Sequence, residues 1–143
     1  MTNDQISSSV AQTQAIAAEF ARTLRGGKCI AMHGDMGAGK TQFVRGLVQG
    51  LGGDERSVSS PTFVLLNIYD TGRLTVYHLD AYRCAGADDF EAIGFPELLE
   101  QGGVVVVEWA ARVADLLPCG VIHVTLEPTG EHQRAIQIQT PSL

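Results

Sequence analysis

The spacing of apolar residues predicts two long helices in the first half of the chain. Apolar side chains recur at helical intervals over residues 10–24, after a Ser9–Gln12 pair with capping-box spacing and before the pair Gly26–Gly27. Residues 43–51 place a second apolar set on one helical face, and glycines follow it. Two shorter helices are predicted over residues 88–93 and 96–100.

Shorter apolar runs predict strands. Residues 29–33 and 104–107 are continuous apolar runs that are too short for stable helices and are typical of strands buried on both faces. Two antiparallel hairpins are predicted, one over residues 63–69 and 74–79 and one over residues 121–126 and 135–139. Residues 136–139 alternate apolar and polar side chains, so this strand has one wet face.

These elements predict an α/β fold in a single domain over residues 1–143. The sheet is expected to be mixed, parallel at its centre with antiparallel hairpins, and flanked by helices. Hydrophobic residues make up 45% and charged residues 18%, which is ordinary usage for a globular domain of this length.

Charge and cysteine content narrow the classes of function. The formal net charge of −6 argues against an extended basic footprint for nucleic acid, so any nucleic acid is expected to be held by a partner. Cys29, Cys84 and Cys119 form no disulfide framework and are expected to be buried thiols in a reducing compartment. No basic leader or apolar run of about 20 residues is present, which predicts a cytoplasmic protein without a membrane segment.

A phosphate-binding loop is the strongest chemical signal. The sequence GxxxxGK(S/T) stands between a predicted strand and a predicted helix, and it comprises Gly34, Asp35, Met36, Gly37, Ala38, Gly39, Lys40 and Thr41. Its glycines allow backbone N–H groups to face phosphate oxygens, and the helix adds the positive end of its dipole. Lys40 is expected to reach the β- and γ-phosphates of ATP from an exposed loop, and the Thr41 hydroxyl to bind Mg²⁺. The alternative is a glycine-rich turn with an incidental lysine.

Two carboxylates end predicted strands, and either can serve a metal ion. Glu108 follows four valines, and Asp80 stands at the end of the predicted strand over residues 74–79. Both are therefore candidates for holding Mg²⁺ or orienting water, and the sequence does not divide these two roles between them. The pair His78 and Asp80 also has the spacing of two metal ligands on one strand face. Trp109 is either a core aromatic residue or an aromatic residue near the nucleotide.

Three further segments carry a family resemblance. The sequences SPTF at residues 60–63, HLDAYR at 78–83 and VVVVEW at 104–109, in this order after the phosphate loop, resemble the TsaE family. The resemblance implies a small bacterial ATPase required for threonylcarbamoyladenosine modification of tRNA, which uses ATP and Mg²⁺, releases ADP and phosphate, and acts with the TsaB and TsaD proteins. Contact with tRNA is then only indirect, through the complex.

The resemblance also implies roles for single residues. Lys40, Asp80 and Glu108 become the catalytic positions, and Thr41, Glu108 and Asp80 the metal positions. Ser60, Pro61 and Thr62 form a switch-like segment, and Trp109, Thr13 and Arg134 join the nucleotide site. The chain departs from the family where Ala110 and Ala111 replace a second acidic residue, so no role is assigned there.

Two other functions fit the phosphate loop. A small-molecule kinase would need an acceptor site and basic lid residues, and no arginine-rich stretch follows the nucleotide motifs. A module that docks when loaded with ATP but does not hydrolyse it is barely distinguishable by sequence. Because no arginine finger is placed by a motif, turnover by the isolated protein is expected to be slow.

Overall fold

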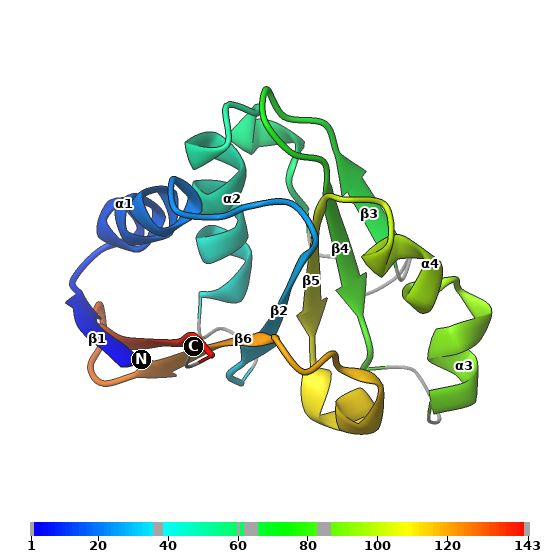
Figure 1. Ribbon diagram of the computed structural model, residues 1–143. Coiled ribbons are helices and arrows are strands. Elements are labelled where there is room, and N and C mark those ends of the chain that lie inside the picture. The colour runs from blue at the N-terminus through cyan, green and yellow to red at the C-terminus, as the bar shows by residue number, and fades with distance from the viewer. Residues whose placement is uncertain (1, 36–38, 60, 62–65, 83–86, 142–143) are drawn as a thin grey trace.

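Seven strands form one mixed sheet in the part of the chain that the structure describes (Figure 1). The computed structural model describes residues 2–35, 39–59, 61, 66–82 and 87–141. The strands are β1 (Thr2–Ser7), β2 (Lys28–His33), β3 (Leu66–Tyr69), β4 (Val76–Asp80), β5 (Val104–Glu108), β6 (Ile122–Pro128) and β7 (Arg134–Gln139). Their order in the sheet is β1-β7-β6-β2-β5-β4-β3.

The sheet is parallel at its centre and antiparallel at its edges. β2 pairs in parallel with β5 and β6, and β5 pairs in parallel with β4. β3 with β4 and β6 with β7 form the two predicted hairpins. The mixed sheet is therefore confirmed, while residues 63–65 of the first predicted hairpin lie outside the described residues.

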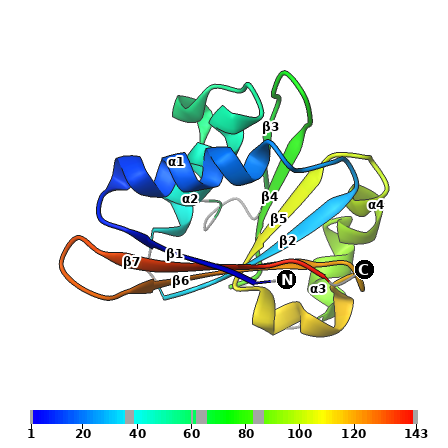
Figure 2. The ribbon, with the colours of Figure 1, turned by 60° about the vertical axis from the view of Figure 1, so that its left-hand side comes forward.

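Helices cover both faces of the central strands (Figures 1 and 2). Helices α1 (Val10–Ala21) and α2 (Lys40–Gly50) lie on one face, and α3 (Ala87–Ala92), α4 (Phe95–Leu99) and the 3-10 segment η2 (Ala110–Leu116) lie on the other. A short 3-10 turn, η1 (Glu55–Ser57), follows α2. Alternate valines of β5 belong to the two cores, which explains why a buried central strand is a continuous apolar run. Among the described residues, no helix has the length and apolar character to cross a membrane.

The start of α1 is as predicted, but its end is not. The Ser9 side chain accepts a hydrogen bond of 3.0 Å from the Gln12 N–H, and the Gln12 side chain accepts one of 2.6 Å from the Ser8 N–H. The first bond satisfies one of the N–H groups that a helix start leaves without partners, and the second ties the Gln12 side chain to the residue before the N-cap. The helix ends at Ala21, earlier than the apolar run indicated. Leu24, the last apolar residue of that run, is buried but follows a turn and does not belong to the helix.

Strand β1 was not predicted. Residues 2–7 are mostly exposed and polar, so they carry neither a helical nor an alternating apolar pattern. The strand forms by antiparallel pairing with β7, with Thr2 opposite Gln139 and Ser7 opposite Arg134. An edge strand gains its stability from the backbone ladder, and such pairing leaves little trace in local sequence.

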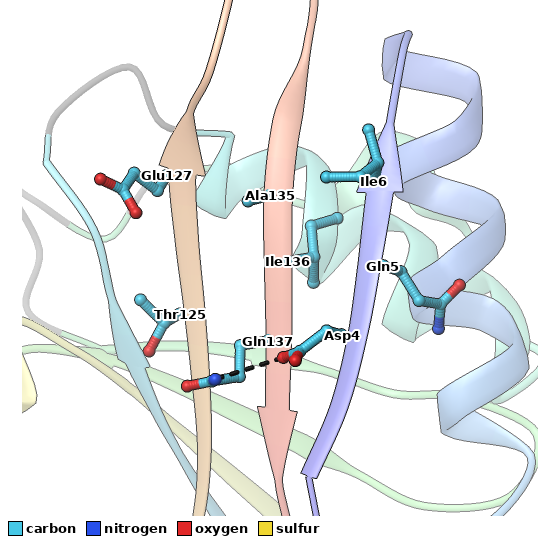
Figure 3. A pocket seen from close by; sticks show the side chains of 8 residues that line it. All are labelled: Asp4, Gln5, Ile6, Thr125, Glu127, Ala135, Ile136 and Gln137. Carbon is cyan, nitrogen blue, oxygen red and sulfur yellow. Dashed lines mark hydrogen bonds between the residues drawn. The ribbon is translucent and has the colours of Figure 1, made fainter.

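The predicted wet face of β7 is confirmed. Ile136 and Ile138 are buried, whereas Gln137 and Gln139 are exposed. On this wet side, β1, β7 and β6 line a hollow of about 380 Å³, in which Gln137 donates a 3.2 Å hydrogen bond to Asp4 (Figure 3).

The cysteines differ in environment. Cys29 is buried in the core, and this burial raises the pKa of its thiol to about 12. Cys119 is exposed, so the expectation of three buried thiols is wrong at this position, which lies in a turn after η2. Cys84 lies outside the described residues.

Helices α1 and α2 touch through glycines. A Cβ atom built on Gly46 would lie 2.2 Å from the Gln14 carbonyl oxygen and 2.6 Å from Gln14 Cα, and one on Gly50 would lie 2.5 Å from the Ala18 carbonyl oxygen. Real atoms do not approach this closely, so the backbones of the two helices meet where no side chain fits. This contact fixes how closely α1 and α2 pack against each other.

We expect Gly46→Ala to lower the free energy of unfolding by about 1–3 kcal/mol, the usual cost of overpacking. The loss should appear although alanine favours a helix interior over glycine by about 1 kcal/mol. Urea unfolding measures the difference. Gly120→Ala is the matched control, because a Cβ atom there meets no atom within 4 Å. Equal stability of the two variants would contradict the close helix contact.

Candidate functional site

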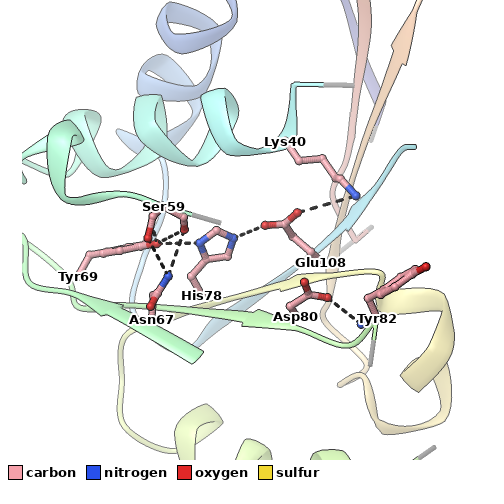
Figure 4. A network of polar contacts seen from close by, with 8 residues as sticks. All are labelled: Lys40, Ser59, Asn67, Tyr69, His78, Asp80, Tyr82 and Glu108. Carbon is pink, nitrogen blue, oxygen red and sulfur yellow. Dashed lines mark hydrogen bonds and ion pairs between the residues drawn. The ribbon is translucent and has the colours of Figure 1, made fainter. Parts of the chain in front are cut away.

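The candidate site lies where β2, β4 and β5 end and α2 begins. β4 ends at Asp80 and β5 at Glu108, and these two residues are direct partners in the parallel ladder. Gly39, with a φ of 99°, caps α2, and Lys40 is the first residue of the helix. The structure thus brings together Lys40, Asp80 and Glu108, the three predicted catalytic positions (Figure 4).

Lys40 is buried rather than exposed, which corrects the expectation of a lysine in an exposed loop. Only 6% of its side chain is accessible, and its Nζ lies 3.8 Å from Glu108 Oε1 and 4.1 Å from the centre of the Trp109 ring. Burial lowers the pKa of Lys40, while the negative charges of Glu108, Asp80 and Asp35 oppose this shift. The ammonium group is therefore poorly hydrated and held mainly by charge and by the aromatic face.

Glu108 is the centre of a buried polar network. Its Oε2 lies 2.5 Å from His78 Nε2, and His78 Nδ1 lies 3.0 Å from the Tyr69 hydroxyl oxygen. His78 is completely buried and Tyr69 is 4% exposed. Both ring nitrogens of His78 thus face protein groups. The arrangement favours an internal hydrogen-bonding role for His78 over the hypothesis that His78 and Asp80 bind a metal ion together.

Asp80 has one satisfied and one unsatisfied oxygen. Its Oδ1 accepts a 2.7 Å hydrogen bond from the Tyr82 N–H. Its Oδ2 is buried and has no hydrogen-bond partner among the described residues. A buried carboxylate oxygen without a partner is costly, so this atom is the one in the site whose chemistry calls for a cation or a donor.

Trp109 has an unusual backbone. Its φ of 56° lies in the left-handed region, the one such value among described residues other than glycine. The side chain is half-buried, and its ring lies 4.9 Å from that of Tyr82, centre to centre. Trp109 is therefore a wall of the site that covers Lys40, and it also packs against the core beneath α3 and α4.

The structure describes only some of the remaining residues of the predicted phosphate loop and switch-like segment. Gly34, at a φ of 145°, and the exposed Asp35 follow β2, and Thr41 is half-buried in the first turn of α2. The predicted loop residues Met36, Gly37 and Ala38 lie outside the described residues. The same holds for Ser60 and Thr62 of the switch-like segment, whereas Pro61 is buried.

Thr13 and Arg134 are brought together by β1. The buried Thr13 hydroxyl is 2.7 Å from that of Ser7, and Ser7 is the strand partner of Arg134. A Cβ atom on Gly39 would lie 3.8 Å from Arg134 Nε, so Arg134 borders the loop end of α2. Their assignment to the nucleotide site stays a prediction.

His33 adds an uncharged wall. It ends β2, and its Nε2 lies 2.9 Å from Nδ1 of His123. Burial lowers the pKa of His33, and electrostatic interactions with His123 and Lys40 lower it further. The ring is therefore neutral at pH 7 and adds no second cation beside Lys40.

The fold and the loop together define the class of protein. A buried parallel strand, the sequence GDMGAGKT and a helix that begins at its lysine make this chain a P-loop protein of the α/β class. The sequence model of the family described as "Threonylcarbamoyl adenosine biosynthesis protein TsaE" matches residues 7–136, and the chain belongs to this family.

Individual relatives agree with this membership. The chain is 44% identical over 117 residues to the "tRNA threonylcarbamoyladenosine biosynthesis protein TsaE" of Treponema pallidum (strain Nichols), covering 82% of this chain and 85% of the relative. It is 38% identical over 125 residues to the protein of that name from Bacillus subtilis (strain 168), covering 87% and 77%. The crystal structure of YdiB from Bacillus subtilis matches with a TM-score of 0.81 and 27% identity, covering 99% of this chain and 87% of that one.

We expect Asp80→Asn to raise the free energy of unfolding in EDTA by about 1 kcal/mol, because it removes a charge from a buried atom without a partner. The asparagine oxygen can still accept from the Tyr82 N–H. Chemical unfolding measures the change, with Asp70→Asn as an exposed control expected to stay within about 0.5 kcal/mol. A clear loss of stability in Asp80→Asn would contradict this expectation and show that the attraction between Asp80 and the buried Lys40 outweighs the cost of burying Oδ2.

Proposed function

We propose that this protein binds ATP with Mg²⁺ and hydrolyses it to ADP and phosphate in the cytoplasm. The observation that carries the proposal is the Lys40 and Glu108 pair beside Gly39. It places a buried lysine at the first turn of a helix, next to a carboxylate at the end of a central strand. Ligands of α/β sheets bind at such strand ends, and P-loop proteins use the same three parts for phosphate, metal and water.

Lys40 is free enough to serve a phosphate. A separation of 3.8 Å from Glu108 Oε1 exceeds hydrogen-bonding distance, so the pair is held by charge rather than by a formed hydrogen bond. A phosphate oxygen can therefore accept from Nζ without a strong bond being broken first. The N–H groups at the start of α2 add donors and a positive dipole end.

The residues present also fit Mg²⁺. Thr41, Asp80 and Glu108 offer oxygen ligands, and the partnerless Asp80 Oδ2 is an acceptor that a cation would satisfy. Within the described residues, no group of three His, Cys, Asp or Glu side chains could hold a metal alone. Mg²⁺ is usually bound by one or two carboxylates together with substrate phosphates, and the neighbouring carboxylates Asp80 and Glu108 match this need. When bound, Mg²⁺ neutralises developing phosphate charge.

The protein groups then divide the work by position. Lys40 binds the β- and γ-phosphate oxygens, and the half-buried Trp109 excludes water from one side of the lysine. Glu108 and Asp80, adjacent on two strands, hold the metal and orient the attacking water. The chemistry is positioning and charge neutralisation, with water as the nucleophile and no covalent bond to the protein.

The biological role proposed is threonylcarbamoyladenosine modification of tRNA, together with TsaB and TsaD. The family description and the printed names of the relatives support the modification. The resemblance of the SPTF, HLDAYR and VVVVEW segments supports the two partners. A net charge of −6 supports contact with tRNA through the complex rather than by this chain alone.

Lys40→Met tests the nucleotide site, because methionine keeps the apolar stem and removes the charge. We expect affinity for Mg²⁺-ATP to fall roughly 10- to 150-fold, equivalent to the about 1.5–3 kcal/mol of a charge-assisted hydrogen bond. Calorimetric titration measures the affinity. Lys28→Met is the matched control, since Lys28 is the other lysine of the chain and is exposed at the start of β2. Unchanged affinity and phosphate release in Lys40→Met would refute the site.

Partner coupling is tested by linkage. We expect TsaB and TsaD to increase phosphate release, and ATP to strengthen association with them more than ADP does, because a partner that prefers the ATP-bound form must tighten ATP binding by the same factor. Partner affinity is measured with ATP, with ADP and without nucleotide. Three equal affinities together with unstimulated release would contradict the coupling and leave ATP binding by the isolated chain intact.

A further inference from the structure

A chain of polar groups leads away from Glu108 on the side opposite Lys40, buried as far as Tyr69 and ending at the exposed residue Ser59 (Figure 4). Glu108 Oε2 contacts His78 on β4, His78 contacts Tyr69 on β3, and the Tyr69 hydroxyl contacts the backbone of Ser59. The chain crosses from the central strand to the sheet edge in three steps. None of the proposed roles in ATP binding uses His78, Tyr69 or Ser59.

The hydrogens of this chain can be assigned from its chemistry. A carboxylate only accepts, so His78 Nε2 carries the hydrogen toward Glu108. In the tautomer that carries this hydrogen, His78 Nδ1 is an acceptor, and the Tyr69 hydroxyl is the donor that fits it. Burial raises the pKa of Tyr69, although hydrogen bonds from the Ser59 backbone and Asn67 oppose the shift, so the hydroxyl keeps its proton at neutral pH.

The Tyr69 hydroxyl faces a second acceptor. It lies 2.9 Å from the Ser59 carbonyl oxygen, and the Ser59 N–H donates to it at 3.3 Å. One hydroxyl proton serves either His78 or Ser59 at a time, so the bond that holds His78 depends on where the Ser59 backbone lies. Asn67 donates to the same Ser59 carbonyl oxygen at 3.1 Å and can satisfy it when Tyr69 turns to His78.

We propose that His78 and Tyr69 are positioning residues that hold Glu108 Oε2, keep Oε1 on the side of Lys40, and tie the orientation of this carboxylate to the backbone of Ser59. This inference rests on the proposed Mg²⁺-nucleotide site. Held at one oxygen, the Glu108 carboxylate does not rotate, and its other oxygen stays available to the site. Groups that orient a metal-binding carboxylate in this way contribute to affinity without touching the ligand.

The test measures the affinity for ADP in EDTA and in Mg²⁺, whose ratio is the magnesium-dependent gain. Tyr69→Phe removes only the hydroxyl group and keeps the ring in the core. We expect it to reduce the gain roughly 10-fold and to leave the affinity in EDTA unchanged. Tyr77→Phe is the matched control, because Tyr77 lies on the neighbouring strand β4 and packs on the opposite face of the sheet from Tyr69, and it should keep the full gain.

The contacts from Glu108 through His78 and Tyr69 to Ser59 are called the relay from here on. A second variant distinguishes an effect of this relay from a general loss of stability. His78→Gln can still donate to Glu108 but offers no ring nitrogen to Tyr69. Because the bonds lie in series, the double variant with Tyr69→Phe should lose no more of the gain than the larger single loss. Losses that multiply would show two independent effects and overturn the relay.

Amide exchange gives a readout that needs no turnover. The Ser59 N–H should exchange more slowly when Mg²⁺-ADP is bound to the wild-type protein, and Tyr69→Phe should abolish this slowing. A magnesium-dependent gain that survives in Tyr69→Phe, or slowing at Ser59 that survives there, overturns the relay alone. A wild-type protein without any magnesium-dependent gain contradicts the proposed function, and this inference with it.

Discussion

A single buried carboxylate constrains the arrangement of the site. Glu108 ends a strand whose valines fill the cores on both faces, and it is 4% exposed, so water does not compensate its charge. Taking a carboxylate out of water is expensive unless partners replace the hydration. The protein supplies these partners from two separate elements, the first residue of α2 and the middle of β4.

This requirement explains why two distant contacts matter for the site. Lys40 reaches Glu108 only if α2 lies at the right height over the sheet, and the backbone contact of Gly46 and Gly50 with α1 holds α2 against its neighbouring helix. His78 reaches Glu108 only in the register that places Asp80 opposite Glu108. A shift of one residue would turn His78 to the other face of the sheet. Helix packing and strand register thus determine the electrostatics of one side chain.

Local pattern was sufficient for the elements whose signals are local. Capping, apolar periodicity and turn residues predicted the start of α1, both hairpins and β5, and the loop motif with two strand-end carboxylates predicted that Lys40, Asp80 and Glu108 meet. Strand β1 was missed because its stability comes from pairing with β7 at the other end of the chain. The burial of Lys40 and the contacts of His78 were missed for the same reason, since both depend on residues distant in sequence.

The left-handed backbone of Trp109 changes which way neighbouring side chains point. In a regular strand, successive side chains face opposite sides of the sheet. Glu108 and Trp109 are successive, yet both contact the same ammonium group, because the turn at Trp109 ends the alternation. A bulky side chain is strained at positive φ, and tryptophan is no exception. Glycine at position 109 would relieve this strain but would remove the aromatic face over Lys40, whereas phenylalanine would keep the strain and offer a smaller ring. The geometry therefore accepts a strained backbone at position 109 in exchange for the aromatic contact with Lys40, independently of any role in binding a partner.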